Sequence, residues 1–160
     1  MKKAIVTGSF DPITIGHMEL VKHASSNYDT VYVVALVNEK KEYMFTMEQK
    51  KRLIELSVSK FPNVIADAYV GMTADYMQKH GITQIIRGVR NEKDREYELV
   101  LAAKMKEFDE SFNTELVLCK DELAHISSTL VRKKIENDER LDGLVPNEIV
   151  DEIRILLGKK

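Results

Sequence analysis

The sequence predicts one α/β domain, built on a doubly wound, five-stranded parallel sheet with flanking helices and a C-terminal helix. Three observations predict this class. Apolar segments alternate with helical patterns along the whole chain, which favours βαβ units and a parallel sheet. The apolar segments are short and rich in β-branched residues, like strands that are covered on both faces. The length of 160 residues is typical of one domain.

The expected strands are residues 3–7, 30–37, 63–68, 83–86 and 114–119. The expected helices are residues 16–26, a segment starting at Thr46, and residues 73–80, 92–108, 127–136 and 146–157. Thr46-Met47-Glu48-Gln49 has the form of a capping box. Gly81 ends one helix, and Pro146 suits the first turn of the last. Seven glycines and three prolines are scattered rather than gathered into a linker, so residues 1–160 are expected to form a single domain.

Composition excludes several classes of function. The 24 basic and 26 acidic residues nearly balance, and nucleic-acid-binding proteins usually carry a basic face. No apolar run approaches the roughly 20 residues that span a bilayer, and the apolar stretch at the N-terminus is too short for the pattern expected of a signal peptide. The single cysteine, Cys119, fits a reducing cytoplasm and is expected to be a small buried residue on a strand.

In a doubly wound sheet, ligands bind beyond the carboxyl ends of the strands, near the point where strand order reverses. The turn after the first strand reads Gly8-Ser9-Phe10-Asp11-Pro12, followed by Thr14-Ile15-Gly16-His17 at the start of a helix. Free backbone N–H groups and the helix dipole favour an anion there. The pattern is neither a G-x-G-x-x-G fingerprint nor a Walker A loop. The turn therefore predicts a phosphate site of another kind.

These two segments resemble the signature of the cytidylyl- and adenylyltransferase superfamily, which has a Rossmann-like fold. In that superfamily the Thr/His-x-Gly-His element binds the α-phosphate region of a nucleoside triphosphate. The resemblance indicates the superfamily but leaves the acceptor open.

Cationic residues follow two further strands. Lys40 and Lys41 come after the second strand, where either a solvated turn or a phosphate contact is expected. Arg87 and Arg90 follow the fourth strand on either side of Gly88-Val89. A guanidinium can bind two phosphate oxygens at once, and the glycine allows a ligand to approach the backbone. This segment therefore predicts a second phosphate contact.

Two motifs narrow the resemblance. Ile86-Arg87-Gly88-Val89-Arg90 and Asp94-Arg95-Glu96-Tyr97-Glu98 are similar to a specific pair of motifs in the phosphopantetheine adenylyltransferase family. His125-Ile126-Ser127-Ser128-Thr129 places hydroxyl groups at another helix N-terminus, and related adenylyltransferases share a similar element. The resemblance covers nearly the whole chain.

The resemblance implies transfer of AMP from ATP to 4′-phosphopantetheine, with dephospho-coenzyme A and pyrophosphate as products. It implies catalytic roles for His17, Lys41 and Arg90. It implies acceptor contacts at Ser9, Lys41, Thr73 and Arg87, and counting back from Met44-Phe45 selects Lys41 over Lys40. The implied ATP contacts are Ser9, Phe10, His17, Gly88, Val89, Arg90, Glu98, Leu123, Ala124, His125, Ile126, Ser127, Ser128 and Thr129. A hexamer and feedback inhibition by coenzyme A are implied as well.

Five residues depart from the family pattern. Thr7 stands where proline is common, Arg95 where an aromatic residue is usual, and Met105 where asparagine is common, and Gly71-Met72 is atypical. These departures affect the expected contacts of the pantetheine arm more than the phosphate chemistry.

The expected mechanism needs no protein nucleophile, because the acceptor phosphate attacks the α-phosphorus in line. The protein then contributes positioning and charge stabilisation. No acidic cluster has the spacing of metal ligands, so Mg²⁺ is expected to be carried by the triphosphate. The alternatives are a nicotinate-mononucleotide adenylyltransferase and a non-catalytic adenine-nucleotide sensor on the same fold.

Overall fold

The computed structural model describes residues 1–159 and has the expected α/β architecture. The strands are β1 Lys3–Gly8, β2 Thr30–Val37, β3 Val64–Val70, β4 Gln84–Val89 and β5 Asn113–Leu118. The α-helices are α1 Ile15–Asn27, α2 Met47–Ser57, α3 Thr73–His80, α4 Glu92–Phe108, α5 Ser128–Glu136 and α6 Val150–Leu156. Two short 3₁₀ helices are η1 Asp121–Leu123 and η2 Asn147–Ile149.

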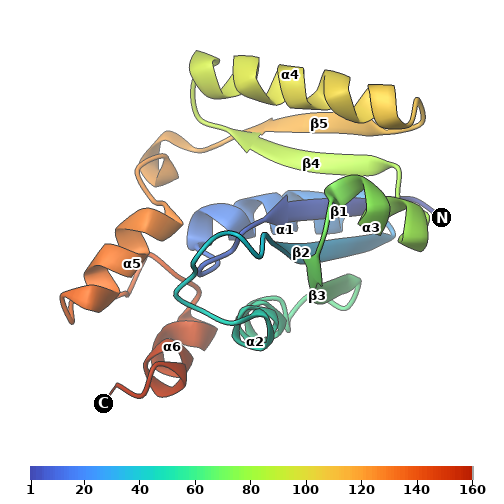
Figure 1. Ribbon diagram of the computed structural model, residues 1–160. Helices are drawn as coiled ribbons and strands as arrows, with labels where there is room; N and C mark the ends of the chain where they lie inside the picture. The colour runs from blue at the N-terminus through green and yellow to red at the C-terminus, as the bar shows by residue number, and fades with distance from the viewer. Residues whose placement is uncertain (160) are drawn as a thin grey trace.

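All neighbouring strands pair in parallel, in the order β3-β2-β1-β4-β5. The order reverses between β1 and β4, so the switch point lies where the loop after β1 meets the end of β4. Figure 1 shows α4 beside β4 and β5, and α5 beyond the carboxyl ends of the strands. This arrangement confirms the predicted fold class.

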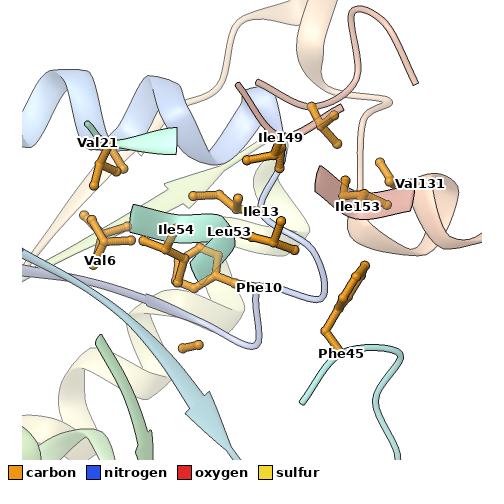
Figure 2. Close-up of a cluster of buried hydrophobic side chains, with 14 of the residues drawn as sticks. Val6, Phe10, Ile13, Val21, Phe45, Leu53, Ile54, Val131, Ile149 and Ile153 are labelled. Carbon is orange, nitrogen blue, oxygen red and sulfur yellow. The ribbon is translucent and has the colours of Figure 1, made fainter. Parts of the chain in front are cut away.

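Alternation along β1 gives the sheet a core on each face. Val6 belongs to one apolar cluster with Val21 of α1 and residues of α2, α5 and α6, whereas Ile5 belongs to a second cluster with Tyr76 and Met77 of α3. Figure 2 shows the first of these cores, in which Phe10 and Ile13 from the loop after β1 join Leu53 and Ile54 of α2 and Ile149 of η2. The loop that carries the expected phosphate site is therefore anchored in the core.

Local signals explain several boundaries. The Thr46 hydroxyl accepts from the Gln49 backbone N–H, and the Gln49 side chain accepts from the Thr46 N–H, which confirms the capping box. Gly81 ends α3 with φ of 65°, a left-handed conformation that glycine adopts without strain.

Three local expectations were wrong. β4 continues to Val89 because it pairs with β5 as far as Leu118, so Arg87 and Gly88 lie within the strand rather than after it. Pro146 precedes a 3₁₀ turn, and the last α-helix begins only at Val150. Cys119 lies just past β5 and is only partly buried.

Candidate active site

Two hollows adjoin the end of β4. The larger one, the main cleft, has a volume of about 350 Å³ and lies between the loop after β1, the start of α1, the end of β4 and the segment before α5. The smaller one, the side cavity, has a volume of about 180 Å³ and is lined by β4, β5, α4 and Thr73 of α3. Thr7 and Arg87 line both hollows. The two hollows therefore meet at the switch point of the sheet.

His17 is the third residue of α1 and lines the main cleft. The backbone N–H of Thr14 donates to His17 Nδ1 at 3.0 Å, and the His17 backbone N–H donates to Thr14 Oγ1 at 3.4 Å. A nitrogen that accepts from a backbone N–H carries no proton, so the neutral ring carries its proton on Nε2. Burial, and secondarily the charge of Arg87, lowers the pKa of His17 to about 4. His17 is therefore a neutral hydrogen-bond donor near pH 7.

Arg87 is held on two sides. Its Nε donates to Glu98 Oε2 at 2.9 Å, and its Nη2 donates to Glu98 Oε1 at 2.8 Å. Its Nη1 donates to the carbonyl oxygen and the hydroxyl of Thr7, both at 3.2 Å. Glu98, on α4, is only 6% exposed and lines the side cavity but not the main cleft. The structure thus brings Arg87 and Thr73 to the side cavity, together with Glu98, for which an ATP contact was expected.

Arg90 follows β4 and lines the main cleft. Its Nε donates to Asp94 Oδ2 at 3.0 Å, and its Nη1 donates to the Ala124 carbonyl at 3.5 Å. The hydrogen bond from the Arg90 side chain, the largest of several contributions, holds the pKa of Asp94 below its usual value. Gly88 also lines this cleft, where a β-carbon would stand 3.2 Å from Leu20 Cδ1 of α1. Its missing side chain thus lets α1 pack closely against β4.

The segment before α5 closes the far side of the main cleft. Ser127 caps α5 by accepting from the Leu130 N–H at 3.1 Å, and Ser128 donates to the Pro12 carbonyl at 2.7 Å. Of the residues expected to contact ATP, the main cleft is lined by Ser9, Phe10, His17, Gly88, Arg90, Leu123, Ile126, Ser127 and Ser128. Those outside its lining are Val89, Glu98, Ala124, His125 and Thr129.

The loop between β2 and α2, residues 38–46, is called the lysine loop because it carries Lys40 and Lys41. It lies apart from both hollows. Lys40 and Lys41 are exposed, and neither lines the main cleft or the side cavity. Lys40 instead lines a shallow depression with Gly71 and Met72. The structure therefore does not bring Lys41 together with Arg87, and its contact with the acceptor stays a prediction.

The expected site residues did not include Asp11, which ties the site's segments together. Asp11 is only 3% exposed, and its carboxylate accepts from the backbone N–H groups of Met44 and Phe45 at 2.9 and 3.0 Å. Arg132 of α5 donates to the Asp11 carbonyl at 2.9 Å. A carboxylate before a proline within an apolar turn was the available signal, because such a group must find buried donors.

Lys50 of α2 was also missed. Its side chain is buried, its ammonium has no hydrogen-bond partner among the described residues, and it lies 3.3 Å from the centroid of the Tyr43 ring. Burial is the main cause that lowers the pKa of Lys50, although the charge of Asp11 opposes the shift. Lys50 therefore lies close enough to Asp11 to be affected by its charge, and it lines neither the main cleft nor the side cavity.

Residues 1–159 contain no group of three or more histidine, cysteine, aspartate or glutamate residues arranged to hold a metal ion. Over the same residues, no helix combines the length and apolar character needed to cross a membrane.

Comparisons with known proteins identify the family of this chain. Residues 5–134 match the sequence profile of the family described as Cytidylyltransferase-like. Phosphopantetheine adenylyltransferase of Clostridium novyi is 37% identical over 159 residues, covering 99% of both chains. The enzyme of that name from Bdellovibrio bacteriovorus is 39% identical over 150 residues, covering 94% of both chains.

Among solved structures, a putative nicotinate-nucleotide adenylyltransferase from Vibrio parahaemolyticus superposes with a TM-score of 0.68 over 96% of this chain and 99% of that one. Its sequence identity is 17%, so the likeness concerns the fold alone. The full-length relatives, all above 30% identity, carry more specific information. This chain therefore belongs to the phosphopantetheine adenylyltransferase family, within the wider Cytidylyltransferase-like family.

Proposed function

We propose that this chain transfers the adenylyl group of ATP to the phosphate of 4′-phosphopantetheine, giving dephospho-coenzyme A and pyrophosphate. The observation that carries the proposal is the junction of two hollows at Arg87. The main cleft, with His17, Arg90 and the start of α5, suits the nucleotide. The side cavity, with Thr73 and the apolar residues of α4, suits the pantetheine arm. The acceptor phosphate then lies between them.

The reaction needs one bond made and one broken. An oxygen of the acceptor phosphate attacks the α-phosphorus of ATP, and the bond from that phosphorus to the pyrophosphate oxygen breaks. His17 donates its Nε2 proton as a hydrogen bond to a non-bridging oxygen, where negative charge gathers in the transition state. Arg90 and the N–H groups at the start of α5 stabilise the leaving pyrophosphate. No protein atom becomes covalently bound.

Lys41 supplies a second charge to the acceptor phosphate in this proposal. This role is supported by the Asp11 carboxylate, whose hydrogen bonds connect the end of the lysine loop to the loop after β1. The charged groups along the main cleft are chiefly donors, which suit phosphate oxygens rather than a cation. A Mg²⁺ ion would therefore be held by the triphosphate rather than by side chains of this chain, and it would neutralise part of the phosphate charge.

Assembly and regulation extend the proposal. Tyr97, Leu99 and Val100 of α4 are exposed apolar residues, and exposed apolar side chains on one helix can mark an interaction surface. We propose a homo-oligomer, a hexamer by family resemblance, whose interface includes α4. Coenzyme A joins an adenylyl half to a pantetheine half, so it would fill both hollows and inhibit the enzyme.

A reducing cytoplasm suits the unpaired Cys119.

Pyrophosphate release from ATP tests the function directly. With 4′-phosphopantetheine as acceptor we expect turnover, and with nicotinate mononucleotide we expect a far lower kcat/KM. Equal or faster turnover of the mononucleotide would identify the alternative enzyme. Tight ATP binding without turnover of either acceptor would instead identify a nucleotide sensor.

A further inference from the structure

Two arginines at the end of β4 are each paired with an acid of α4. Arg87 pairs with Glu98, and Arg90 pairs with Asp94. The two acids are four residues apart, so they lie on the same face of the helix, one turn from each other. Arg87 lines both hollows and Glu98 lines the side cavity, whereas Arg90 lines only the main cleft. One helix thus holds one arginine at the junction of the two hollows and one in the main cleft.

Hydrophobic packing does not explain why the charged side chain of Glu98 is buried. Glu98 is the one buried residue of α4, whose other positions are exposed or partly exposed. A buried carboxylate is costly unless it is paired and hydrogen-bonded. Both oxygens of Glu98 are used by Arg87, at 2.8 and 2.9 Å. Glu98 therefore differs from the other residues of α4 in that its buried carboxylate holds the Arg87 guanidinium through two hydrogen bonds.

The guanidinium plane of Arg87 is consequently fixed before any ligand arrives. Its contacts with Glu98 use Nε and Nη2, and its contacts with Thr7 use Nη1. Arginine has five N–H groups, so at least one remains for a phosphate at the junction of the hollows. An arginine whose rotamer is already ordered loses less entropy when it binds a ligand.

We propose that Glu98 is a positioning residue for the acceptor, which acts by orienting Arg87, and that it does not contact the nucleotide. The inference rests on the proposed function, because it takes the side cavity as the acceptor site. It departs from the family resemblance, which implied an ATP contact at this position. By the same geometry, Asp94 orients Arg90 toward the nucleotide.

Two variants of Glu98 separate orientation from charge. Glu98→Gln keeps the length of the side chain but opposes an amide N–H group to an arginine N–H group, so the paired contact is lost. Glu98→Asp keeps the charge but is one methylene too short. We expect each variant to raise the Kd of 4′-phosphopantetheine by about 3- to 10-fold, the cost of re-ordering one arginine, and to leave the Kd of ATP within about 2-fold. Calorimetry with each ligand alone measures both constants.

Asp94→Asn is the matched control on the same helix face. We expect it to raise the Kd of ATP by about 2- to 5-fold, since its ion pair is more exposed, and to leave acceptor binding within about 2-fold. This crossed pattern would not arise from general loosening of α4. Equal effects of Glu98→Gln on both ligands, or an effect on ATP alone, would overturn the inference. Tighter acceptor binding by Glu98→Gln would also overturn it, because charge neutralisation would then be the role of Glu98.

A double-mutant cycle covers the case in which Glu98→Gln fails to fold. If Glu98 acts only through Arg87, Arg87→Ala and the Arg87→Ala/Glu98→Gln pair bind the acceptor with the same Kd, within about 2-fold. The double variant leaves no unpaired buried charge, which favours its folding. A further loss in the double variant would show a direct contact and refute the inference. The parent is measured first: if it binds ATP but not 4′-phosphopantetheine, the proposed function itself has failed.

Discussion

At His17, hydrogen bonding decides which nitrogen can act on a ligand. Nδ1 is occupied by the Thr14 backbone N–H at 3.0 Å, so the donor that remains is Nε2–H. The edge-on Phe10 ring, with its centroid 4.9 Å from that of His17, restricts the imidazole from the side. A ring held in this way donates without reorganisation when charge develops at phosphorus.

His17→Ala tests this role against a helix cap. We expect kcat to fall by about 10²–10³, the usual cost of one preorganised donor, while the Kd of ATP changes by only a few-fold. Thr14→Ala is the control, because it removes the cap hydroxyl but keeps the backbone N–H that orients the ring. It should cost about 1 kcal/mol of stability with a much smaller loss of kcat. A near-parental kcat for His17→Ala would leave His17 with a capping role alone.

Stability should depend on pH through the same residue. The pKa of His17 is about 4 in the folded protein and about 6.5 in an unfolded chain. Between these values the unfolded state binds more protons, so the free energy of unfolding falls as pH drops from 6.5 toward 4. Above pH 6.5 this contribution is constant. Denaturant titrations of the parent and of His17→Ala should show a steeper fall for the parent; equal slopes would contradict the neutral ring.

Residue types were easier to predict than residue partners. The Gly8-to-His17 turn and the two arginines were recognisable because strand, turn and helix N-terminus follow one another along the chain. The Arg87–Glu98 contact joins residues 11 positions apart across a strand and a helix, and Asp11 reaches 33 positions to Met44. Such contacts depend on how the elements pack, which a single sequence does not encode locally.

At the scale of elements, the lysine loop is held by Asp11. The Asp11 carboxylate accepts hydrogen bonds from the backbone N–H groups of Met44 and Phe45, which lie just before the N-cap of α2. Two hydrogen bonds to one buried carboxylate are stronger than neutral ones. They fix where the loop ends, so they limit the positions that Lys41 can reach.

Asp11→Asn should therefore affect both stability and acceptor use. An amide has one oxygen for two donors, so one backbone N–H loses its partner, and we expect a loss of about 2–3 kcal/mol. The freed loop should also raise KM for 4′-phosphopantetheine several-fold. Thr46→Ala is the control, since it should cost about 1 kcal/mol by removing the cap of α2 without that change in KM. Chemical denaturation and steady-state kinetics separate the two effects, and an unchanged KM in Asp11→Asn would contradict the role of the loop.

The ends of helices were predicted correctly where the sequence carries a strong local signal, such as a capping box or a terminal glycine. The capping box at Thr46 and the glycine at the end of α3 were both predicted, because each acts within one helical turn. The end of β4 was not, because β5 extends its hydrogen bonding to Val89. Arg87 and Gly88 are residue types that favour a loop, but pairing with the parallel strand β5 keeps them in the sheet.

For the whole molecule, the strand order decides the chemistry. The reversal between β1 and β4 brings the loop after β1 beside Arg87, so a main cleft and a side cavity share one wall. Each hollow alone would suit a binding protein. Together they suit a direct transfer, in which the acceptor phosphate meets the α-phosphorus without a covalent enzyme intermediate.

The stereochemistry at the α-phosphorus tests this claim most directly. ATP with one sulfur of known configuration at the α-phosphorus is turned over with 4′-phosphopantetheine, and the configuration of the product is read by phosphorus NMR. One in-line displacement inverts the centre, which is the result that the two adjoining hollows predict. Retention would require two displacements through a nucleotidylated residue, and it would contradict direct transfer.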